Sequence, residues 1–253
     1  NVGTYTATAT PKANYAWSDG TTTAKTLNWK ITEKASSSLT VTLATTTYTY
    51  DGTAKEPTVA VKDGTNTLTA GTDYTVSYSN NINAGAATVT ITMKGNYSGT
   101  ITKNFTIERA KTASATASDK TYNGSAQMGV TGTNVDLSGT TSATNVGTYT
   151  ATATPKANYA WSDGTTTAKT LTWKITEKAS SSLTVTLVTT TYTYDGTAKE
   201  PAVTVKDGST TLTLNTHYTV AYSSNTNAGT ATVTITMKGN YSGTITKNFT
   251  IER

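Results

Sequence analysis

The side chains that most often carry chemistry are few in this chain of 253 residues, and they stand far apart. The chain has one histidine, His217, and no cysteine. A Ser-His-Asp triad needs a histidine base, and a histidine metal centre needs several such ligands, so neither can be assembled. In the equivalent position of an internal repeat, His217 is replaced by Asp73, which predicts an exposed position at the start of a strand.

Most aspartates are followed by glycine, as Asp51 and Asp195 are. At such turns the carboxylate bonds its own backbone, whereas a glycosidase needs two carboxylates that face each other across a cleft. We therefore expect no enzymatic activity and no cofactor. Calcium is the alternative, because oxygen ligands could gather where two modules meet, although no Asp-x-Asp-x-Asp run exists. The candidate calcium ligands are Asp51, Glu56, Asp195 and Glu200.

The tryptophans fall into two classes. Trp17 and Trp161 precede a Ser-Asp-Gly turn, and an indole at a hairpin tip can stack on a sugar ring or on neighbouring protein. We favour packing for this pair and keep Trp17 and Trp161 as candidate ligand contacts. Trp29 and Trp173 are in phase with Leu and Ile residues two positions away, which predicts that both lie in a core.

An internal repeat organises these residues. Tyr50, Tyr122 and Tyr194 each precede x-Gly and recur at equal intervals, and a fixed period indicates an array of modules. Residues 1–109 match residues 145–253 at all but 13 positions, so two kinds of module, A and B, alternate. Both kinds carry Asn-x-Gly at one fixed distance before Asn-Tyr, and both end in an aromatic-x-Ile strand. We interpret the three tyrosines as core anchors of their modules.

The repeat predicts four domains. Residues 1–34 are the C-terminal half of an A-type module, 35–109 a B-type module, 110–178 an A-type module and 179–253 a B-type module. Because the first A-type module lacks its first half here, we expect upstream residues to supply the strands that complete it.

The local pattern predicts an all-β fold. Apolar residues alternate with Thr or Ser, as in Leu39-Val41-Leu43 and Val89-Ile91-Met93, and 67 of the 253 residues are Thr, which suits a half-exposed pleated surface. Asp-Gly and Asn-Gly pairs supply the positive φ that tight hairpin turns need. Short antiparallel strands at this spacing predict a tandem array of small Ig-like β-sandwiches. The alternative is a single curled antiparallel sheet per module.

Charge and hydropathy limit the partners. The net charge of +5 comes from 18 scattered lysines and two arginines, whereas nucleic-acid binders cluster basic residues on one face. No apolar run reaches the length of roughly 18 residues that a membrane-spanning helix needs. We therefore expect neither nucleic-acid binding nor membrane insertion of this segment. The expected partners are the neighbouring modules of the same chain, with host glycan or protein as the alternative.

Residues 49–107 resemble the tandem Ig-like repeats of large bacterial surface proteins, the YDG- and MBG-type modules. The B-type copies match through Tyr-Asp-Gly, Asp-Tyr-Thr-Val-x-Tyr, Asn-Ala-Gly and Gly-Asn-Tyr-Ser-Gly. The A-type copies depart from the pattern, with Tyr-Asn-Gly and the insert AWSDGTTTA before the last strand. The resemblance implies an extracellular, cell-wall-associated protein of many modules, and it brings no catalytic residues.

Two functional hypotheses follow. The first is a stalk or spacer that projects a distal domain, because short linkers between small modules limit bending. The second is adhesion, in which the A-type inserts around Trp17 and Trp161 bind glycan or host protein and repetition raises avidity.

Overall fold

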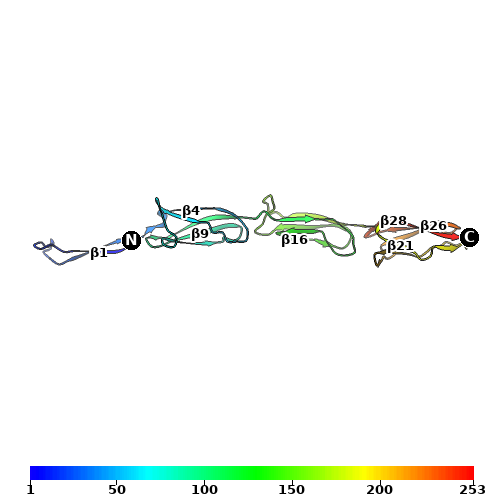
Figure 1. The fold of residues 1–253 in the computed structure, drawn as a ribbon, viewed down its shortest axis with the longest axis horizontal. Helices are drawn as coiled ribbons and strands as arrows, with labels where there is room; N and C mark the ends of the chain where they lie inside the picture. The colour runs from blue at the N-terminus through cyan, green and yellow to red at the C-terminus, as the bar shows by residue number, and fades with distance from the viewer. The chain divides into compact units, whose positions relative to one another are not determined.

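The structure, a computed structural model, describes residues 1–253 (Figure 1). It consists of strands and loops, with two single-turn 3₁₀ helices, η1 (Ser36–Ser38) and η2 (Ser180–Ser182). The prediction of an all-β fold is confirmed. No helix has the length and apolar character needed to cross a membrane.

The chain divides into two compact units. The first comprises Asn1–Lys111 together with the short segment Ala157–Ala160. The second comprises Thr112–Lys156 and Trp161–Arg253. Each unit holds strands of one A-type and one B-type module, while the finer boundaries between modules stay a prediction.

The B-type module of the first unit has one four-stranded sheet, in the order β5-β11-β9-β8, and one three-stranded sheet, in the order β4-β6-β7. A two-stranded sheet joins β3 to β10. The strands are β3 (Lys34–Ala35), β4 (Thr40–Leu43), β5 (Thr47–Thr49), β6 (Val59–Asp63), β7 (Asn66–Thr67), β8 (Tyr74–Ser79), β9 (Gly85–Met93), β10 (Tyr97–Ser98) and β11 (Thr100–Glu108).

The core of this module lies between the two larger sheets. Val41 and Val61 from the three-stranded sheet pack with Val89, Ile91 and Phe105 from the four-stranded sheet. Along β9 the apolar side chains are buried at every second position, and Thr fills the positions between them. Two sheets that share one core form a sandwich, as the alternation predicts, and not a single curled sheet.

Five strand pairings differ from the antiparallel ones expected from the sequence, because their strands run parallel. β5 runs parallel to β11, with Tyr48 opposite Ile107. The second unit repeats this pairing between β22 (Thr191–Thr193) and β28 (Thr244–Glu252), with Tyr192 opposite Ile251. The sequence predicted antiparallel strands and did not reveal these parallel pairs, because periodicity reveals which face of a strand is buried but not which way the strand runs.

The A-type module of the second unit has a mixed sheet in the order β13-β19-β18-β16 and two pairs, β12-β15 and β14-β17. Trp173 of β19 is its central core residue, 1% exposed, and its indole Nε1 donates to the Thr140 carbonyl oxygen at 2.8 Å. A Cβ on Gly129 would lie 1.9 Å from the Trp173 ring, so glycine alone fits there. The strands are β12 (Ser114–Ala117), β13 (Lys120–Thr121), β14 (Gln127–Met128), β15 (Val130–Thr133), β16 (Val135–Gly139), β17 (Ser142–Ala143), β18 (Gly147–Pro155) and β19 (Lys169–Thr176).

The B-type module of the second unit repeats the sandwich of the first, with sheets β22-β28-β26-β25, β21-β23-β24 and β20-β27. Its core again joins Val185 and Val205 to Val233, Ile235 and Phe249. The remaining strands are β20 (Lys178–Ala179), β21 (Thr184–Leu187), β23 (Val203–Asp207), β24 (Thr210–Thr211), β25 (Tyr218–Ser223), β26 (Gly229–Met237) and β27 (Tyr241–Ser242).

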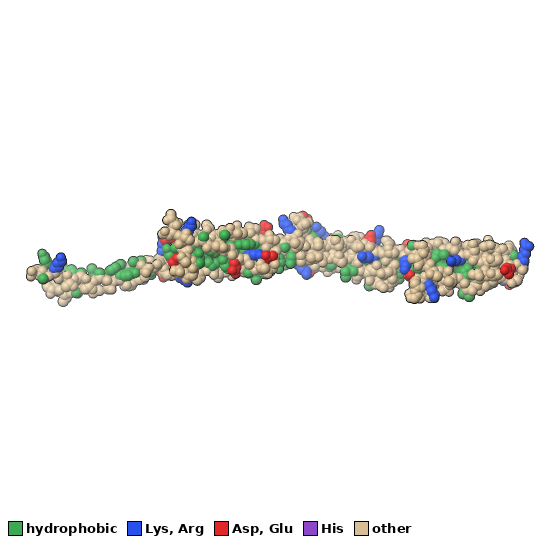
Figure 2. All heavy atoms as spheres, viewed as in Figure 1, with side chains coloured by type: hydrophobic (Ala, Val, Ile, Leu, Met, Phe, Trp, Pro, Cys, Tyr) green, Lys and Arg blue, Asp and Glu red, His purple; other side chains and the backbone are tan.

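Residues 1–34 form a lone antiparallel hairpin of β1 (Gly3–Ala9) and β2 (Lys25–Ile31). Trp29 is 50% exposed, and Leu27 and Ile31 are exposed beside it. Hydrophobic side chains are visible along this hairpin in Figure 2. The prediction of a core position is therefore confirmed for Trp173 and wrong for Trp29 in this chain. Val130 and Tyr122 belong to the core around Trp173, and residues 1–34 contain no equivalent of either.

The Asp-Gly pairs have the backbone geometry predicted for them, but only two close tight hairpins. Gly64 and Gly208 have φ of 59° and 57° and connect the short pairs β6-β7 and β23-β24. Gly20, Gly52 and Gly164 also have positive φ, and they lie in longer loops. The Asp-Gly pair itself favours a positive φ, whereas the length of the loop depends on whether the two flanking strands pair with each other.

The two equivalent tryptophans allow a matched test of core packing. Trp173→Ala should lower the free energy of unfolding of the second unit by about 3–5 kcal/mol, because it empties the centre of a core. Trp29→Ala removes a half-exposed ring and should cost about 1 kcal/mol or less. Urea unfolding measures both changes, and equal losses would contradict the different burial of the two indoles.

Candidate functional site

The aspartates of the repeated Asp-Gly pairs bind their own turns. Asp51 Oδ1 accepts from the backbone N–H and the hydroxyl of Thr53, at 2.9 and 2.6 Å, and Asp51 Oδ2 pairs with the Lys55 ammonium. Asp195 makes the same contacts in the second unit. The lysine ammonium, and then the threonine, hold the pKa of both carboxyls well below its usual range. Both carboxylates are thus already occupied by a cation and a turn.

The candidate calcium ligands are not brought together. Glu56 and Glu200 are exposed, and the structure holds no group of three or more His, Cys, Asp or Glu side chains that could bind a metal ion. Basic and acidic side chains are both scattered over the face seen in Figure 2, and neither kind gathers into one large patch.

His217 has the same structural role as Asp73. Its Nδ1 accepts from the Thr213 backbone N–H at 2.9 Å, as Asp73 Oδ2 accepts from the Thr69 backbone N–H at 2.8 Å. His217 is half-buried just before β25, which is less exposed than the sequence predicted. The histidine replaces a loop-closing acceptor and is not part of a cluster of reactive groups.

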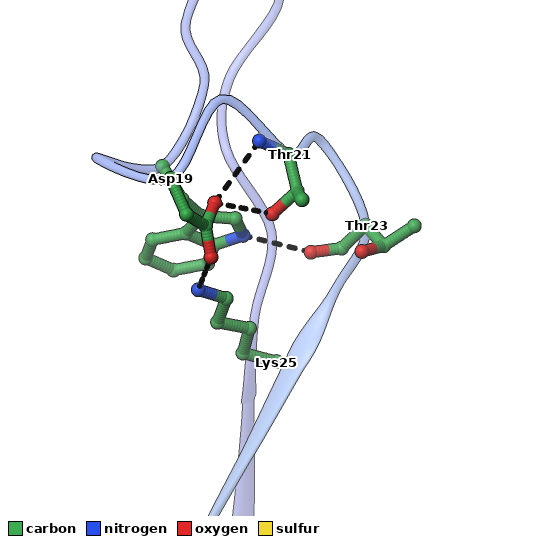
Figure 3. A network of polar contacts seen from close by, with 5 residues as sticks. Asp19, Thr21, Thr23 and Lys25 are labelled. Carbon is green, nitrogen blue, oxygen red and sulfur yellow. Dashed lines mark hydrogen bonds and ion pairs between the residues drawn. The ribbon is translucent and has the colours of Figure 1, made fainter.

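The insert around Trp17 closes on itself. The indole Nε1 donates to the Thr23 carbonyl oxygen at 2.7 Å, and the Lys25 ammonium lies 5.1 Å from the ring centroid. Asp19 accepts from the backbone N–H and hydroxyl of Thr21, at 3.0 and 2.7 Å, and pairs with Lys25 at 2.6 Å (Figure 3). The Trp17 indole therefore packs within its own loop.

The second copy of the insert repeats this arrangement and buries the indole further. Trp161 is 3% exposed, its Nε1 donates to the Thr167 carbonyl oxygen at 2.8 Å, and Lys169 lies 4.4 Å from the ring centroid. A ring with so little exposed surface offers no face for a sugar. The contacts of Trp161 therefore favour local packing over the ligand contact considered from the sequence.

A different set of residues recurs where modules meet within a unit. In the second unit, Asn240 Oδ1 accepts from the Val146 backbone N–H at 2.8 Å, and its Nδ2 donates to Asn145 Oδ1 at 3.0 Å. The Asn240 carbonyl oxygen accepts from the Lys178 backbone N–H at 3.0 Å. We call this arrangement the asparagine clamp: the Asn of Asn-Tyr holds the first two residues of an Asn-x-Gly loop in the preceding module.

The first unit contains the clamp twice. Asn96 Oδ1 accepts from the Val2 backbone N–H at 3.0 Å, and Asn96 Nδ2 donates to Asn1 Oδ1 at 3.4 Å. In the segment Ala157–Ala160, Asn158 holds Asn83 and Ala84 with distances of 2.9 and 3.0 Å. The three clamps use equivalent residues of the repeat.

An edge-on pair of tyrosines accompanies the clamp. The rings of Tyr122 and Tyr241 have centroids 5.3 Å apart and planes at 80°, and those of Tyr50 and Tyr159 are 5.5 Å apart at 84°. Such pairs contribute about 0.5–1.5 kcal/mol beyond their buried area. Burial, and then the nearby Asp207 carboxylate, raise the pKa of the Tyr241 hydroxyl.

The three repeat tyrosines therefore lie at module ends. Tyr50 and Tyr122 are half-buried and reach the tyrosine of an Asn-Tyr pair, while Tyr194 is 48% exposed. Tyr50 also packs on the edge of its own core, but Tyr194 is not a core residue of its module. The most deeply buried aromatic residues are instead Phe105, Trp173 and Phe249, each 1–2% exposed.

The sequence carries a signal for the clamp that periodicity alone does not reveal. Asn-x-Gly and Asn-Tyr recur together in both kinds of module, at the same spacing each time. The spacing suggests contact within a module, whereas Val146 and Asn240 are 94 residues apart and belong to different modules. Only the structure reveals that each pair is shared between neighbours.

Comparisons with known proteins add little. No family model matches the chain. No curated protein matches it either. The chain is similar to a solved structure titled "PcdhgB3 EC1-4 in 50 mM HEPES", with 11% identity and a TM-score of 0.19, over 99% of this chain and 82% of that one. A TM-score of this size supports no conclusion on fold or function.

The Asp19 loop predicts a low titration midpoint. The Lys25 ammonium, and then the hydroxyl and backbone N–H of Thr21, lower the pKa of Asp19 from 3.8 to about 2. The contribution of this carboxylate to loop stability is thus present above the ordinary pKa and is lost as the pH falls through about 2. Carboxyl NMR should show this midpoint, and Lys25→Met should raise it. Lys30→Met, on the same strand, is the control, and an equal rise in both variants would contradict the assignment.

The clamp predicts a local change in hydrogen exchange. Asn240→Ala removes the acceptor of the Val146 N–H, and a bond of this kind contributes about 0.5–1.5 kcal/mol. The Val146 amide should therefore exchange about 2- to 13-fold faster, as NMR can measure. Asn248→Ala, at an exposed position on β28, should leave Val146 unchanged. An unchanged rate in Asn240→Ala would mean that the clamp does not protect the junction.

Proposed function

We propose that this chain is a non-catalytic run of extracellular modules that acts as a stalk or spacer and projects a distal domain from a bacterial cell wall. The observation that carries the proposal is the asparagine clamp, which recurs with equivalent residues in both units. A chain whose modules were independent would have no reason to repeat a contact between them.

The energetics of the clamp support this role. Each clamp supplies two side-chain hydrogen bonds of about 0.5–1.5 kcal/mol each, and two of the three are accompanied by a tyrosine pair. Together these contacts contribute a few kcal/mol per junction. This free energy is smaller than the contribution of a hydrophobic core but larger than the thermal energy. In a linear array the stability is roughly a sum of module and neighbour terms, so every added module gains the same neighbour term.

The resemblance to YDG- and MBG-type repeats supports the cell-surface setting of the proposal. Lysines scattered along the strands fit the same setting, because charged edges oppose pairing between chains. The tryptophans of the inserts are used by their own loops, so no observation in the structure favours adhesion through them.

Small-angle X-ray scattering tests the spacer role. A compact globule of 253 residues should have a radius of gyration of about 18 Å, and the spacer proposal expects about 30 Å or more. The triple variant Asn96→Ala, Asn158→Ala and Asn240→Ala should broaden the distance distribution, while Asn248→Ala should not. A radius close to that of the compact globule would overturn the proposal, because the modules would then fold back on one another.

A further inference from the structure

The turn that follows Tyr122 differs from the equivalent turns of the B-type modules in one functional group. Where Asp51 and Asp195 precede a glycine, the A-type module has Asn123 before Gly124. No other asparagine of the chain is followed by glycine. An amide in this position carries a reactivity that a carboxylate lacks, because the next backbone nitrogen can attack its carbonyl carbon and displace ammonia.

Asn123 has the geometry that this attack needs. Its Oδ1 accepts from the Ser125 backbone N–H at 2.9 Å, a contact that folds the side chain back over the intervening Gly124 nitrogen. A donor on the amide oxygen also stabilises the negative charge that develops there when a nucleophile adds. The Gly124 N–H itself makes no backbone hydrogen bond, so the attacking nitrogen is free.

The surroundings of the turn leave room for the reaction. Asn123, Gly124 and Ser125 are all exposed, and a Cβ built on Gly124 would meet no atom within 4 Å. Gly124 has φ of 82°, a conformation that glycine adopts at no steric cost. Water can therefore reach the amide, and ammonia can leave it.

Other asparagines lack part of this combination. In the asparagine clamp, the amide of Asn240 is bound through both its oxygen and its nitrogen, and the next residue is Tyr241, whose Cβ crowds the backbone nitrogen. Asn83 precedes a small residue, Ala84, but the Ala84 N–H donates to Asn158 Oδ1 at 3.0 Å. The nitrogen that would attack Asn83 is thus already engaged.

The aspartates of the equivalent turns are protected by their charge. Asp51 and Asp195 accept a backbone N–H in the same way, but each also pairs with a lysine ammonium. This ammonium, and then the neighbouring threonine, hold the pKa of both carboxyls well below its usual range. An ionised carboxylate resists attack by a nitrogen, because oxide would have to leave it. The A-type module has Gln127 at the position of these lysines, so its turn has neither the charge nor the partner.

We propose that Asn123 is a site of spontaneous deamidation. The Gly124 nitrogen loses its proton and bonds to Asn123 Cγ, the Cγ–Nδ2 bond breaks, and ammonia leaves with that proton. Water then opens the resulting cyclic succinimide at either of its two carbonyl carbons. Opening at Cγ gives aspartate, and opening at the backbone carbonyl carbon gives isoaspartate, whose main chain runs through Cβ and Cγ. Overall, an amide and water become a carboxylate and ammonium, with no oxidant, reductant or enzyme.

The reaction places a new charge beside a module junction. Tyr122 packs edge-on against Tyr241, and its backbone N–H donates to the Thr176 carbonyl oxygen at 2.8 Å. Aspartate at position 123 keeps the acceptor of the Ser125 N–H. Isoaspartate adds a methylene to the main chain directly after Tyr122 and moves that acceptor. The two products therefore differ in their effect, and only isoaspartate should disturb the turn.

Prolonged incubation of the full chain at neutral pH, followed by tandem mass spectrometry of its peptides, tests the proposal. Position 123 should gain the mass difference between an amide and a carboxylic acid before any other asparagine changes. The product should separate into two chromatographic forms, and an isoaspartyl methyltransferase should label one of them. In ¹⁸O-labelled water the new carboxylate should contain ¹⁸O.

Three variants provide the controls. Gly124→Ala should slow the reaction about tenfold or more, because a Cβ on the attacking residue has to raise the barrier by only about 1.4 kcal/mol for this effect. Asn248→Ala, at an exposed position on β28, should react like the parent. Asn123→Asp reproduces one product, so in ¹H–¹⁵N NMR its Ser125 amide should match the aspartate form and differ from the isoaspartate form.

Two outcomes would overturn the proposal. One is a chain in which Asn123 stays intact while a synthetic peptide of residues 119–127 deamidates under the same conditions, since the fold would then block the attack. The other is aspartate at position 123 without isoaspartate, which would indicate direct hydrolysis of the side-chain amide. The reaction needs only the turn and water, so neither outcome bears on the spacer role, which scattering tests separately.

Discussion

Each sandwich of this chain is held together by a single layer of apolar side chains between two small sheets. This layer buries the inner faces of the sheets but leaves the ends of the module uncovered, and the rest of the structure depends on that limit. In the B-type modules, Val61, Val89 and Ile91 or their equivalents are completely buried in this layer. Thr occupies the outward positions, where a β-branched side chain suits an exposed strand. A module of about 70 residues has no second layer to close its ends, because its surface is large relative to its volume. The ends are therefore where polar backbone groups and partly buried tyrosines meet a neighbour.

In the asparagine clamp, one side chain satisfies polar groups at the end of a module. An amide carries both an acceptor and donors, so a single asparagine satisfies the Val146 N–H and the side chain of Asn145 at once. Neither a carboxylate nor an ammonium could do both, and either would add a charge to be desolvated. The exchange of Asp73 for His217 follows the same rule, because each supplies one acceptor for a loop N–H.

The sequence predicts the strands and the cores well because burial at period two is a local property. Val89, Ile91 and Trp173 lie where alternation places them. The parallel pairing of β5 with β11 could not be read in this way, because it joins the two ends of a module and leaves no local pattern. The candidate site residues were chosen by residue type, and residue type does not reveal which contacts a side chain already makes. Asp51 and Trp161 have the residue types of ligand sites, but their partners, Lys55 and Thr167, stand close by in the sequence and occupy them first.

The parallel pairing of β5 with β11, and of β22 with β28, has a mechanical consequence. β5 enters from the amino-terminal side of its module and β11 leaves at the carboxyl end, so a stretching force applied to these two strands pulls them in opposite directions along their length. The hydrogen bonds of the parallel ladder are then loaded at the same time, in shear, and do not break one after another. The backbone bonds from Tyr50 to Glu108 and from Thr106 to Thr46 lengthen that shared ladder at both ends. Resistance to tension is thus a property of strand direction in these modules, independent of how strongly each module folds.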